Sequence, residues 1–241
     1  DFKDAMIAVG PSATLDLDDI IIDGAAEYVS DGNPVISAGG TASTARATVN
    51  MRGTSQLRSN AGGGVKLGAY SELSLYDTAR IEDIEGNAVE LAGIGASFNM
   101  LMNSRILSEK RRDGAVLKDR CAVYAGDDTN VQLRDAASIS VGDAETAARL
   151  RGALYLDGGV SVTGQIRLEN PDNPIRLCTV PASGNQYHLS LAESFLGKNA
   201  VIPEGTSVTD AAQYLSEFVK AEDGIKEHEN WILKSVSPNI V

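Results

Sequence analysis

The sequence predicts an all-β fold, a parallel β-helix of about five to seven irregular coils with a small C-terminal capping segment. Short apolar pairs with period two, such as Val65/Leu67 and Leu73/Leu75, indicate brief strands with one face inward. Only 5% of the residues are aromatic and 24 are glycines, which favours the narrow aliphatic core of a solenoid. A six-residue step from an apolar pair to a lone apolar residue recurs at Met51–Leu57, Leu75–Ile81, Met100–Ile106 and Leu133–Ile139.

The coils are predicted from successive groups of apolar residues separated by turn-forming Gly, Pro, Asp and Asn. The groups are Ile7/Val9, Leu15/Leu17 and Ile20–Ile22; Val49/Met51 and Leu57; Val65/Leu67, Leu73/Leu75 and Ile81; Val89/Leu91, Phe98/Met100 and Ile106; Val123/Ala125, Val131/Leu133 and Ile139; and Leu154/Leu156, Val160/Val162 and Ile166/Leu168. Each coil buries its apolar side only by stacking on its neighbours.

Loop length varies between coils, whereas strand spacing does not. Equating Leu67, Leu91, Ala125 and Leu156 gives steps of 24, 34 and 31 residues. Polar excursions are predicted at 37–48, 108–120 and 142–151, and residues 143–150 are expected to form one or two helical turns. Such excursions project from the corners of a solenoid.

The β-helix is predicted to occupy residues 1–180, and residues 181–241 are predicted to form a cap packed on the last coil. A helix is expected at about 209–221, because five apolar residues there share one helical face: Ala211, Tyr214, Leu215, Phe218 and Val219. Covering the open end prevents exposed strand edges from recruiting other chains.

Charge argues against nucleic acid and anionic membranes as partners. The net charge is −12 and the pI is near 4.6, which disfavours nucleic acid because phosphate binding needs clustered Lys and Arg. No apolar run approaches the ~20 residues of a membrane span.

The opening segment, Asp1–Asp4, lacks a charged-then-apolar leader, so a fragment of a larger protein is expected. Cys121 and Cys178 fit no zinc motif and are predicted to be free thiols.

The candidate site residues are few. Asp127 and Asp128 follow a predicted strand and are expected to stabilise a coil corner, while Arg111 and Arg112, beside Lys110, are candidates for binding an anionic sugar or phosphate. A calcium site is a further alternative, built from the carboxylates Asp16, Asp18, Asp19 and Asp23. His188 is expected to be structural. We therefore predict no catalytic residue, no metal and no cofactor.

The coils also resemble a known family. Gly64–Leu67, Leu73–Leu75 and Ile81, with Phe98–Met100 and Ile106, resemble the repeated coils of Gram-positive bacterial surface proteins of the right-handed parallel β-helix class. The segments Val162–Leu168, Tyr214–Phe218 and Trp231–Leu233 look like the terminal section of those proteins. The resemblance implies an extracellular, adhesin-like location on a bacterial cell surface, where the β-helix serves as a stalk or binds a host or bacterial surface protein or glycan.

An enzyme of the same architecture is the alternative. Polysaccharide lyases and glycoside hydrolases of the pectin-lyase-like class share the fold, and Gly126-Asp127-Asp128 resembles the paired aspartates of such hydrolases. Their Gly-His-Gly and Arg-Ile-Lys motifs are missing here. Three hypotheses therefore remain: a binding module, a structural spacer and a carbohydrate-active enzyme.

Overall fold

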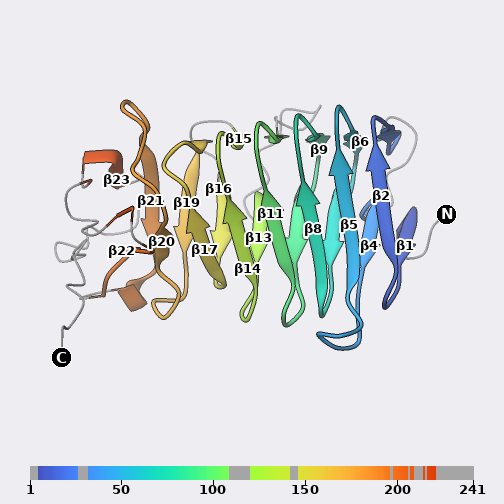
Figure 1. The fold of residues 1–241 in the computed structure, drawn as a ribbon, viewed down its shortest axis with the longest axis horizontal. Coiled ribbons are helices and arrows are strands. Elements are labelled where there is room, and N and C mark those ends of the chain that lie inside the picture. Colours follow the sequence, from blue (N-terminus) through green and yellow to red (C-terminus); the bar gives the residue numbers. More distant parts are fainter. Residues whose placement is uncertain are drawn as a thin grey trace.

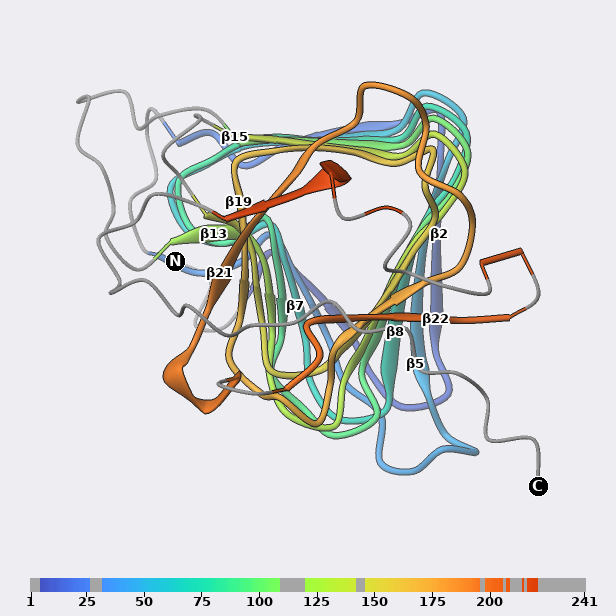
Figure 2. The ribbon, with the colours of Figure 1, turned by 90° about the vertical axis from the view of Figure 1, so that its left-hand side faces the viewer.

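The chain folds as a right-handed parallel β-helix, as predicted, in a computed structural model. The structure describes residues 5–26, 32–108, 120–141, 146–195, 198–205, 207–208, 214 and 216–220. Strands from successive coils lie side by side along the long axis (Figure 1), and all the ladders between them are parallel. Seen along that axis, the coils superimpose and enclose the core on three sides (Figure 2).

The three sides are sheets A, B and C, which the chain visits in that order. Sheet A contains β1 (Ile7–Val9), β4 (Ile36–Ala38), β7 (Val65–Leu67), β10 (Val89–Leu91), β13 (Cys121–Ala125), β16 (Thr146–Leu150), β19 (Gln165–Leu168), β21 (Tyr187–Leu191) and β23 (Phe218–Lys220). Sheet B contains β2 (Thr14–Asp18), β5 (Ala47–Arg52), β8 (Ser71–Leu75), β11 (Ser97–Met100), β14 (Asn130–Leu133), β17 (Ala153–Leu156), β20 (Ile175–Leu177) and β22 (Val201–Pro203). Sheet C contains β3 (Ile21–Asp23), β6 (Gln56–Asn60), β9 (Arg80–Ile84), β12 (Arg105–Ser108), β15 (Ser138–Val141) and β18 (Ser161–Thr163).

The predicted register is confirmed in sheets B and C. One inward column stacks Leu75 on Met100 and Met100 on Leu133. A second column runs through Ile81, Ile106 and Ile139. All these side chains are buried, so the columns form the continuous core that a solenoid needs.

The six-residue step has a simple cause, a four-residue turn at the corner between sheets B and C. In each of five coils the N–H of the fourth turn residue donates to the carbonyl of the first. The pairs are Ser55 to Arg52, Ala79 to Tyr76, Ser104 to Leu101, Ala137 to Arg134 and Val160 to Asp157. The fourth residue is small or β-branched and buried in every case. This turn returns the chain inward after a constant number of residues.

Aspartates join these turns from one coil to the next. Asp77 and Asp135 occupy the second turn position with positive φ, which few residues other than Gly, Asn and Asp adopt easily. The Asp77 carboxylate accepts the Gly53 N–H at 2.9 Å, and Asp135 accepts the Met102 N–H at 2.9 Å. Each carboxylate therefore satisfies a backbone donor of the preceding coil.

The sixth coil corrects the predicted alignment. Residues Thr146–Leu150 form strand β16 rather than helical turns, and Leu150 pairs with Ala125. Leu156 pairs with Leu133 in sheet B and is not the equivalent of Ala125. The sequence did not predict β16 because this strand includes two alanines and an arginine. Large apolar side chains therefore do not alternate with polar ones along it.

Two further predictions need correction. The excursion expected at 37–48 is shorter, because both of its ends lie in strands, β4 and β5. In the helix expected at 209–221, residues 218–220 instead form strand β23, which pairs with β21. Residues 209–213, 215 and 221 lie outside the described residues.

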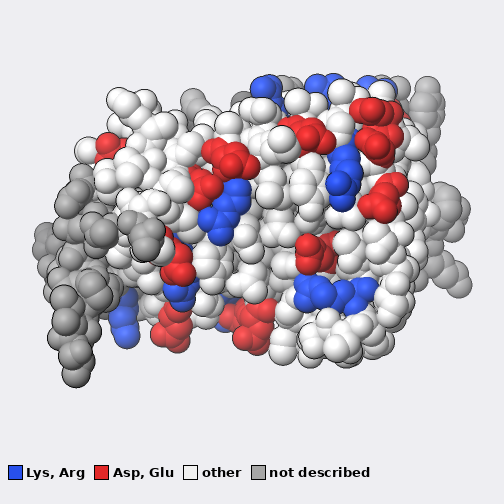
Figure 3. Space-filling model, in the orientation of Figure 1, with Lys and Arg blue, Asp and Glu red and all other residues white. Residues whose placement is uncertain are grey.

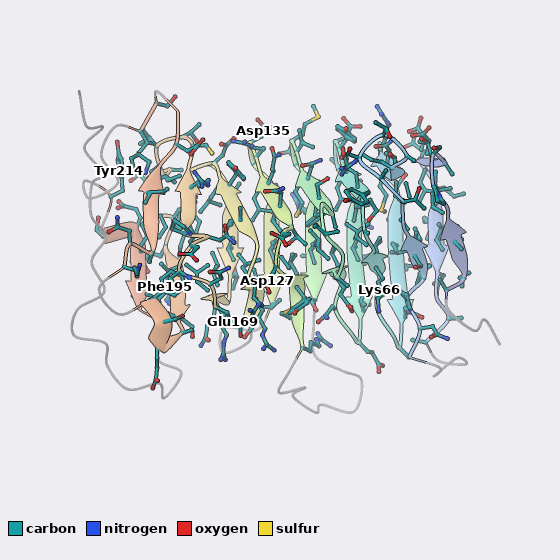
Figure 4. The ribbon with its side chains drawn as sticks, turned by 90° about the horizontal axis from the view of Figure 1, so that it is seen from below. Lys66, Asp127, Asp135, Glu169, Phe195 and Tyr214 are labelled. Carbon is teal, nitrogen blue, oxygen red and sulfur yellow. The ribbon has the colours of Figure 1, made fainter. Side chains whose placement is uncertain are left out.

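Sheets A and B continue past residue 180, the predicted end of the β-helix. There β21 pairs with β19 and β22 pairs with β20. Aromatic side chains gather at this end of the molecule, where Figure 4 labels Phe195 and Tyr214. Phe195 is buried, Tyr214 packs against the core, and the rings of Tyr187 and Phe218 stack with centroids 5.2 Å apart. These rings enlarge the core where the sheet C strands have ended.

Candidate functional site

A groove lies at the corner between sheets C and A of the described surface. Its volume is about 1010 Å³, and its lining comes from five successive coils. At ~4.8 Å per coil, this corresponds to a length of roughly 19 Å along the axis. The lining is mostly small or polar and includes Ala8, Asn33, Ser37, Gly63, Lys66, Glu85, Asn87, Glu90 and Arg120.

Glycines make the groove possible. A Cβ on Gly62 would meet the backbone of Gly32 and Asn33, and a Cβ on Gly86 would meet the backbone of Gly62. Backbone therefore packs on backbone at this corner, which leaves no room for a side chain at Gly62 or Gly86.

Charged groups on the floor and wall are held in place by defined contacts. Lys66 and Glu90 stand side by side on β7 and β10, with Nζ 3.4 Å from Oε1. Arg120 donates to the Glu85 carbonyl at 3.2 Å and to the Ser108 hydroxyl at 2.8 Å. These contacts present both signs of charge along one groove.

Lys66 and Glu90 belong to an outward row that runs from β1 to β21 of sheet A. Register places the members on successive strands: Ala8, Ser37, Lys66, Glu90, Tyr124, Arg149, Arg167 and Ser190. Figure 4 shows Lys66, Asp127 and Glu169 following one another along the same side of the solenoid, whereas Asp135 lies on the opposite side. The row thus connects the groove to a second group of charges.

That second group contains three arginines and two carboxylates. Glu169 Oε1 accepts from Arg149 Nε at 2.7 Å and lies 3.2 Å from Arg167 Nε. Arg151 Nε donates to Asp127 at 2.9 Å. The adjacent carboxylates raise the pKa of Arg149 and of Arg151, so both guanidinium groups stay charged.

The outer face of sheet B is different. Figure 3 shows this face with acidic and basic side chains next to one another and wide uncharged areas between them. Arg46 pairs with Glu72 at 3.6 Å, and Asn99 donates to the same carboxylate at 3.3 Å. The ring of Tyr155 lies between the guanidinium groups of Arg134 and Arg176. The polar side chains named here therefore contact one another across neighbouring strands.

The predicted site residues fall into two groups. Asp127 and Asp128 lie at the corner between sheets A and B, where Asp128 has a φ of 56° and its carbonyl accepts the Gly95 N–H. Arg111 and Arg112 lie outside the described residues, as does Lys110. The structure therefore brings Asp127 to Arg151, a residue distant in sequence.

Three of the four aspartates considered for calcium contact protein groups. Asp16 accepts from Asn50, Asp19 from Thr54, and Asp23 from Arg58. No cluster of three or more His, Cys, Asp or Glu suited to a metal occurs among the residues that the structure describes. His188 is exposed and lines a smaller hollow of about 520 Å³ beside β18.

Both cysteines are free, as predicted. Burial raises the pKa of Cys121 to about 12, so this thiol stays protonated at neutral pH.

Sequence reasoning missed the groove and the arginine group. Arg149 and Glu169 are separated by 20 residues, and only the pairing of β16 with β19 brings them together. Correct alignment of Leu150 with Leu168 was the signal that could have found Arg149 and Glu169 together.

No helix in the described part of the chain combines the length and apolar character that a membrane span needs. Comparison with models of known protein families, with curated proteins and with solved structures finds no match for this chain.

Proposed function

We propose that this chain is a non-catalytic binding module of a bacterial cell-surface protein, in which the groove at the corner of sheets C and A holds a glycan. The observation that carries the proposal is the groove itself, which runs along five coils and is lined by small and polar residues. An extended polymer with many hydroxyl groups fits such a lining, because amide, carboxylate and ammonium groups offer both donors and acceptors.

A peptide ligand is less well matched. An added strand needs an open sheet edge, but β4, β7 and β10, which lie beneath most of the groove, are paired on both sides, and β1 offers an edge only at the end of the groove. An amphipathic helix needs an apolar groove, and a proline-rich segment needs an aromatic one. The described lining contains no aromatic side chain. A glycan is therefore the favoured class of ligand.

The proposed location rests on the coil sequences, which resemble those of Gram-positive surface proteins. The same resemblance supports a module within a larger protein, and a spacer that binds nothing is the competing role. The two roles differ in whether the groove contributes to binding.

Filling the groove tests the proposal. Ser37 points outward on β4 between Ala8 and Lys66, so Ser37→Trp should obstruct the groove without entering the core. Ser140→Trp is the matched control, because Ser140 points outward on β15 in sheet C. The wild type should bind members of a glycan array, Ser37→Trp should lose that binding, and Ser140→Trp should keep it. Absence of glycan binding by the wild type, or equal binding by all three proteins, would contradict the proposal.

A carbohydrate-active enzyme is the second candidate, because the carboxyl-bearing residues Glu85 and Glu90 both line the groove. Paired carboxylates are the groups that glycoside hydrolases use as acid and base or nucleophile. Incubation of the wild type and Glu90→Gln with pectin, polygalacturonate, alginate and glycosaminoglycans distinguishes the two functions. We expect no reducing ends or unsaturated products from either protein. Product formed by the wild type and lost in Glu90→Gln would establish the enzyme.

A further inference from the structure

The arginine group forms a two-by-two array of outward positions on neighbouring coils. Arg149 on β16 pairs in register with Arg167 on β19. Arg151 and Glu169 each follow two residues later, just beyond the ends of the same strands. Three of the four positions therefore carry a guanidinium group, within a spacing of ~4.8 Å between strands.

Glu169 anchors this array. Its side chain is 9% exposed and approaches Nε of Arg149 and Arg167, whose side chains are 37% and 43% exposed. Arg151 is fixed separately through Nε by Asp127, which also accepts a weaker bond from Asn170 at 3.4 Å. The three guanidinium groups are thus positioned from their Nε side.

Their Nη groups remain available. Within the described residues, no hydrogen bond uses an Nη atom of Arg149, Arg151 or Arg167. The ring centroid of Tyr124 lies 5.9 Å from the Arg149 guanidinium carbon. Paired Nη donors on a planar guanidinium match the two oxygens of a carboxylate, or those of a sulfate.

The array lies on the path that leaves the groove. Arg149 is two strands beyond Glu90 in the same outward row, a distance of roughly 10 Å. The positions directly after β7, β10 and β13 are occupied by Gly68, Ala92 and Gly126. These small residues leave space beside the outward row. A polymer that occupies the groove can continue over these small residues to the arginines.

We propose that Arg149, Arg151 and Arg167 bind the anionic group of an acidic polysaccharide, either the carboxylate of a uronic acid or a sulfate ester. The inference rests on the proposed function, since it names the class of glycan that the groove module prefers. It also identifies the arginine array as the site that discriminates charged from neutral chains.

The negative charge of the whole protein does not oppose this site strongly. Exposed charges farther than ~8 Å apart are largely screened at physiological ionic strength. Among the described residues, the ion pairs of the array join three guanidinium groups and two carboxylates, Glu169 and Asp127. The local excess is therefore positive, in a chain whose net charge is −12.

The test measures binding of three purified polymers to the full chain: polygalacturonate, chondroitin sulfate and a neutral glucan. The variants are Arg167→Gln and Arg167→Lys, and Arg58→Gln is the matched control. Arg58 is paired through Nε with Asp23 on sheet C and has a similar exposure of 40%. Unfolding temperatures are recorded for all proteins; Arg167→Gln should be nearly unchanged, because Glu169 keeps its bond to Arg149.

The wild type should prefer at least one acidic polymer to the neutral glucan, and this preference should weaken as salt is added. Arg167→Gln should bind that polymer on the order of tenfold to hundredfold more weakly, the effect of losing a charged hydrogen bond. Arg167→Lys should be intermediate because it keeps the charge and loses the planar pair of donors. Arg58→Gln should bind as the wild type does.

The outcomes separate this inference from the groove proposal. Equal binding of acidic and neutral polymers that is insensitive to Arg167→Gln but abolished by Ser37→Trp would overturn the arginine site alone. Acidic binding that is lost in Arg167→Gln but unaffected by Ser37→Trp would overturn the groove and keep the arginine site. Both polymers carry uronic acids, so binding of polygalacturonate would show that a carboxylate suffices, whereas binding of chondroitin sulfate but not of polygalacturonate would show that the sulfate ester is needed.

Discussion

Replacing Ile106 by Ala tests how the stacked core stabilises this molecule. Ile106 is fully buried in the fourth coil, with Ile81 below it and Ile139 above it in the same column. Both neighbours are fixed by their own strands and have little freedom to close the space. The substitution therefore leaves a cavity enclosed on both sides along the axis.

The expected cost follows from the atoms removed. Ile→Ala deletes three carbons, and each buried methylene contributes about 0.8 kcal/mol, which gives roughly 2.4 kcal/mol for transfer alone. The residual cavity adds to this figure, and buried Ile→Ala changes typically cost 2–5 kcal/mol in total. We therefore expect Ile106→Ala to lower the free energy of unfolding by about 3–4 kcal/mol.

Ile22→Ala is the matched comparison. Ile22 stands in the same column but in the first coil, where it is only partly buried and pairs with Leu57 alone. Less area is removed from water and the gap opens toward solvent, so about 1 kcal/mol is expected. Urea unfolding followed by far-ultraviolet circular dichroism measures both values. A cost for Ile106→Ala no larger than that for Ile22→Ala would refute the stacked-column reasoning.

Three further predictions concern the corners and the thiols. Asp77→Ala should destabilise the protein by about 1–3 kcal/mol in urea unfolding, whereas Asp77→Gly should cost less because glycine tolerates the positive φ. Iodoacetamide should label half-buried Cys178 of the native protein before buried Cys121, with peptide mass spectrometry as the readout; faster labelling of Cys121 would contradict the register of β13. Hydrogen bonds from Thr54 lower the pKa of Asp19 in the folded protein. The Asp19 carboxylate therefore stabilises the fold fully above its ordinary pKa of ~3.9, and this stabilisation is lost as pH falls through its folded-state pKa. The difference in unfolding temperature between wild type and Asp19→Asn should therefore shrink on acidification, and a difference that grows would exclude this role.

The sequence was most informative where inward residues are large. Met51, Leu75, Met100 and Leu133 each precede the same four-residue turn, so their spacing revealed the architecture. Strand β16 was missed because Ala147 and Ala148 are the inward or corner residues and give little contrast with their polar neighbours. Periodicity predicts a strand only when the buried side chains differ clearly from the exposed ones.

The candidate site was much less predictable, for a physical reason. Outward residues do not influence the period that identifies the strands, so their relative positions depend wholly on a correct register. The sequence alignment equated Ala125 with Leu156 instead of Leu150, so Arg149 and Arg151 were assigned to a loop. Their position beside Arg167 was therefore not predicted. The groove was also invisible, because it arises from backbone packing at Gly62 and Gly86 rather than from any motif.

The turn between sheets B and C has a consequence for how this molecule can change. Adding one residue there would rotate the next strand of sheet C and exchange its inward and outward faces, since side chains alternate along a strand. The corner between sheets C and A has no such constraint: a single residue, Gly164, joins β18 to β19, whereas residues 61–64 join β6 to β7. Insertions and deletions can thus accumulate beside the groove while the turn on the opposite edge keeps the coils aligned. The shape of this corner can therefore change through loop length alone, without any change to the buried columns.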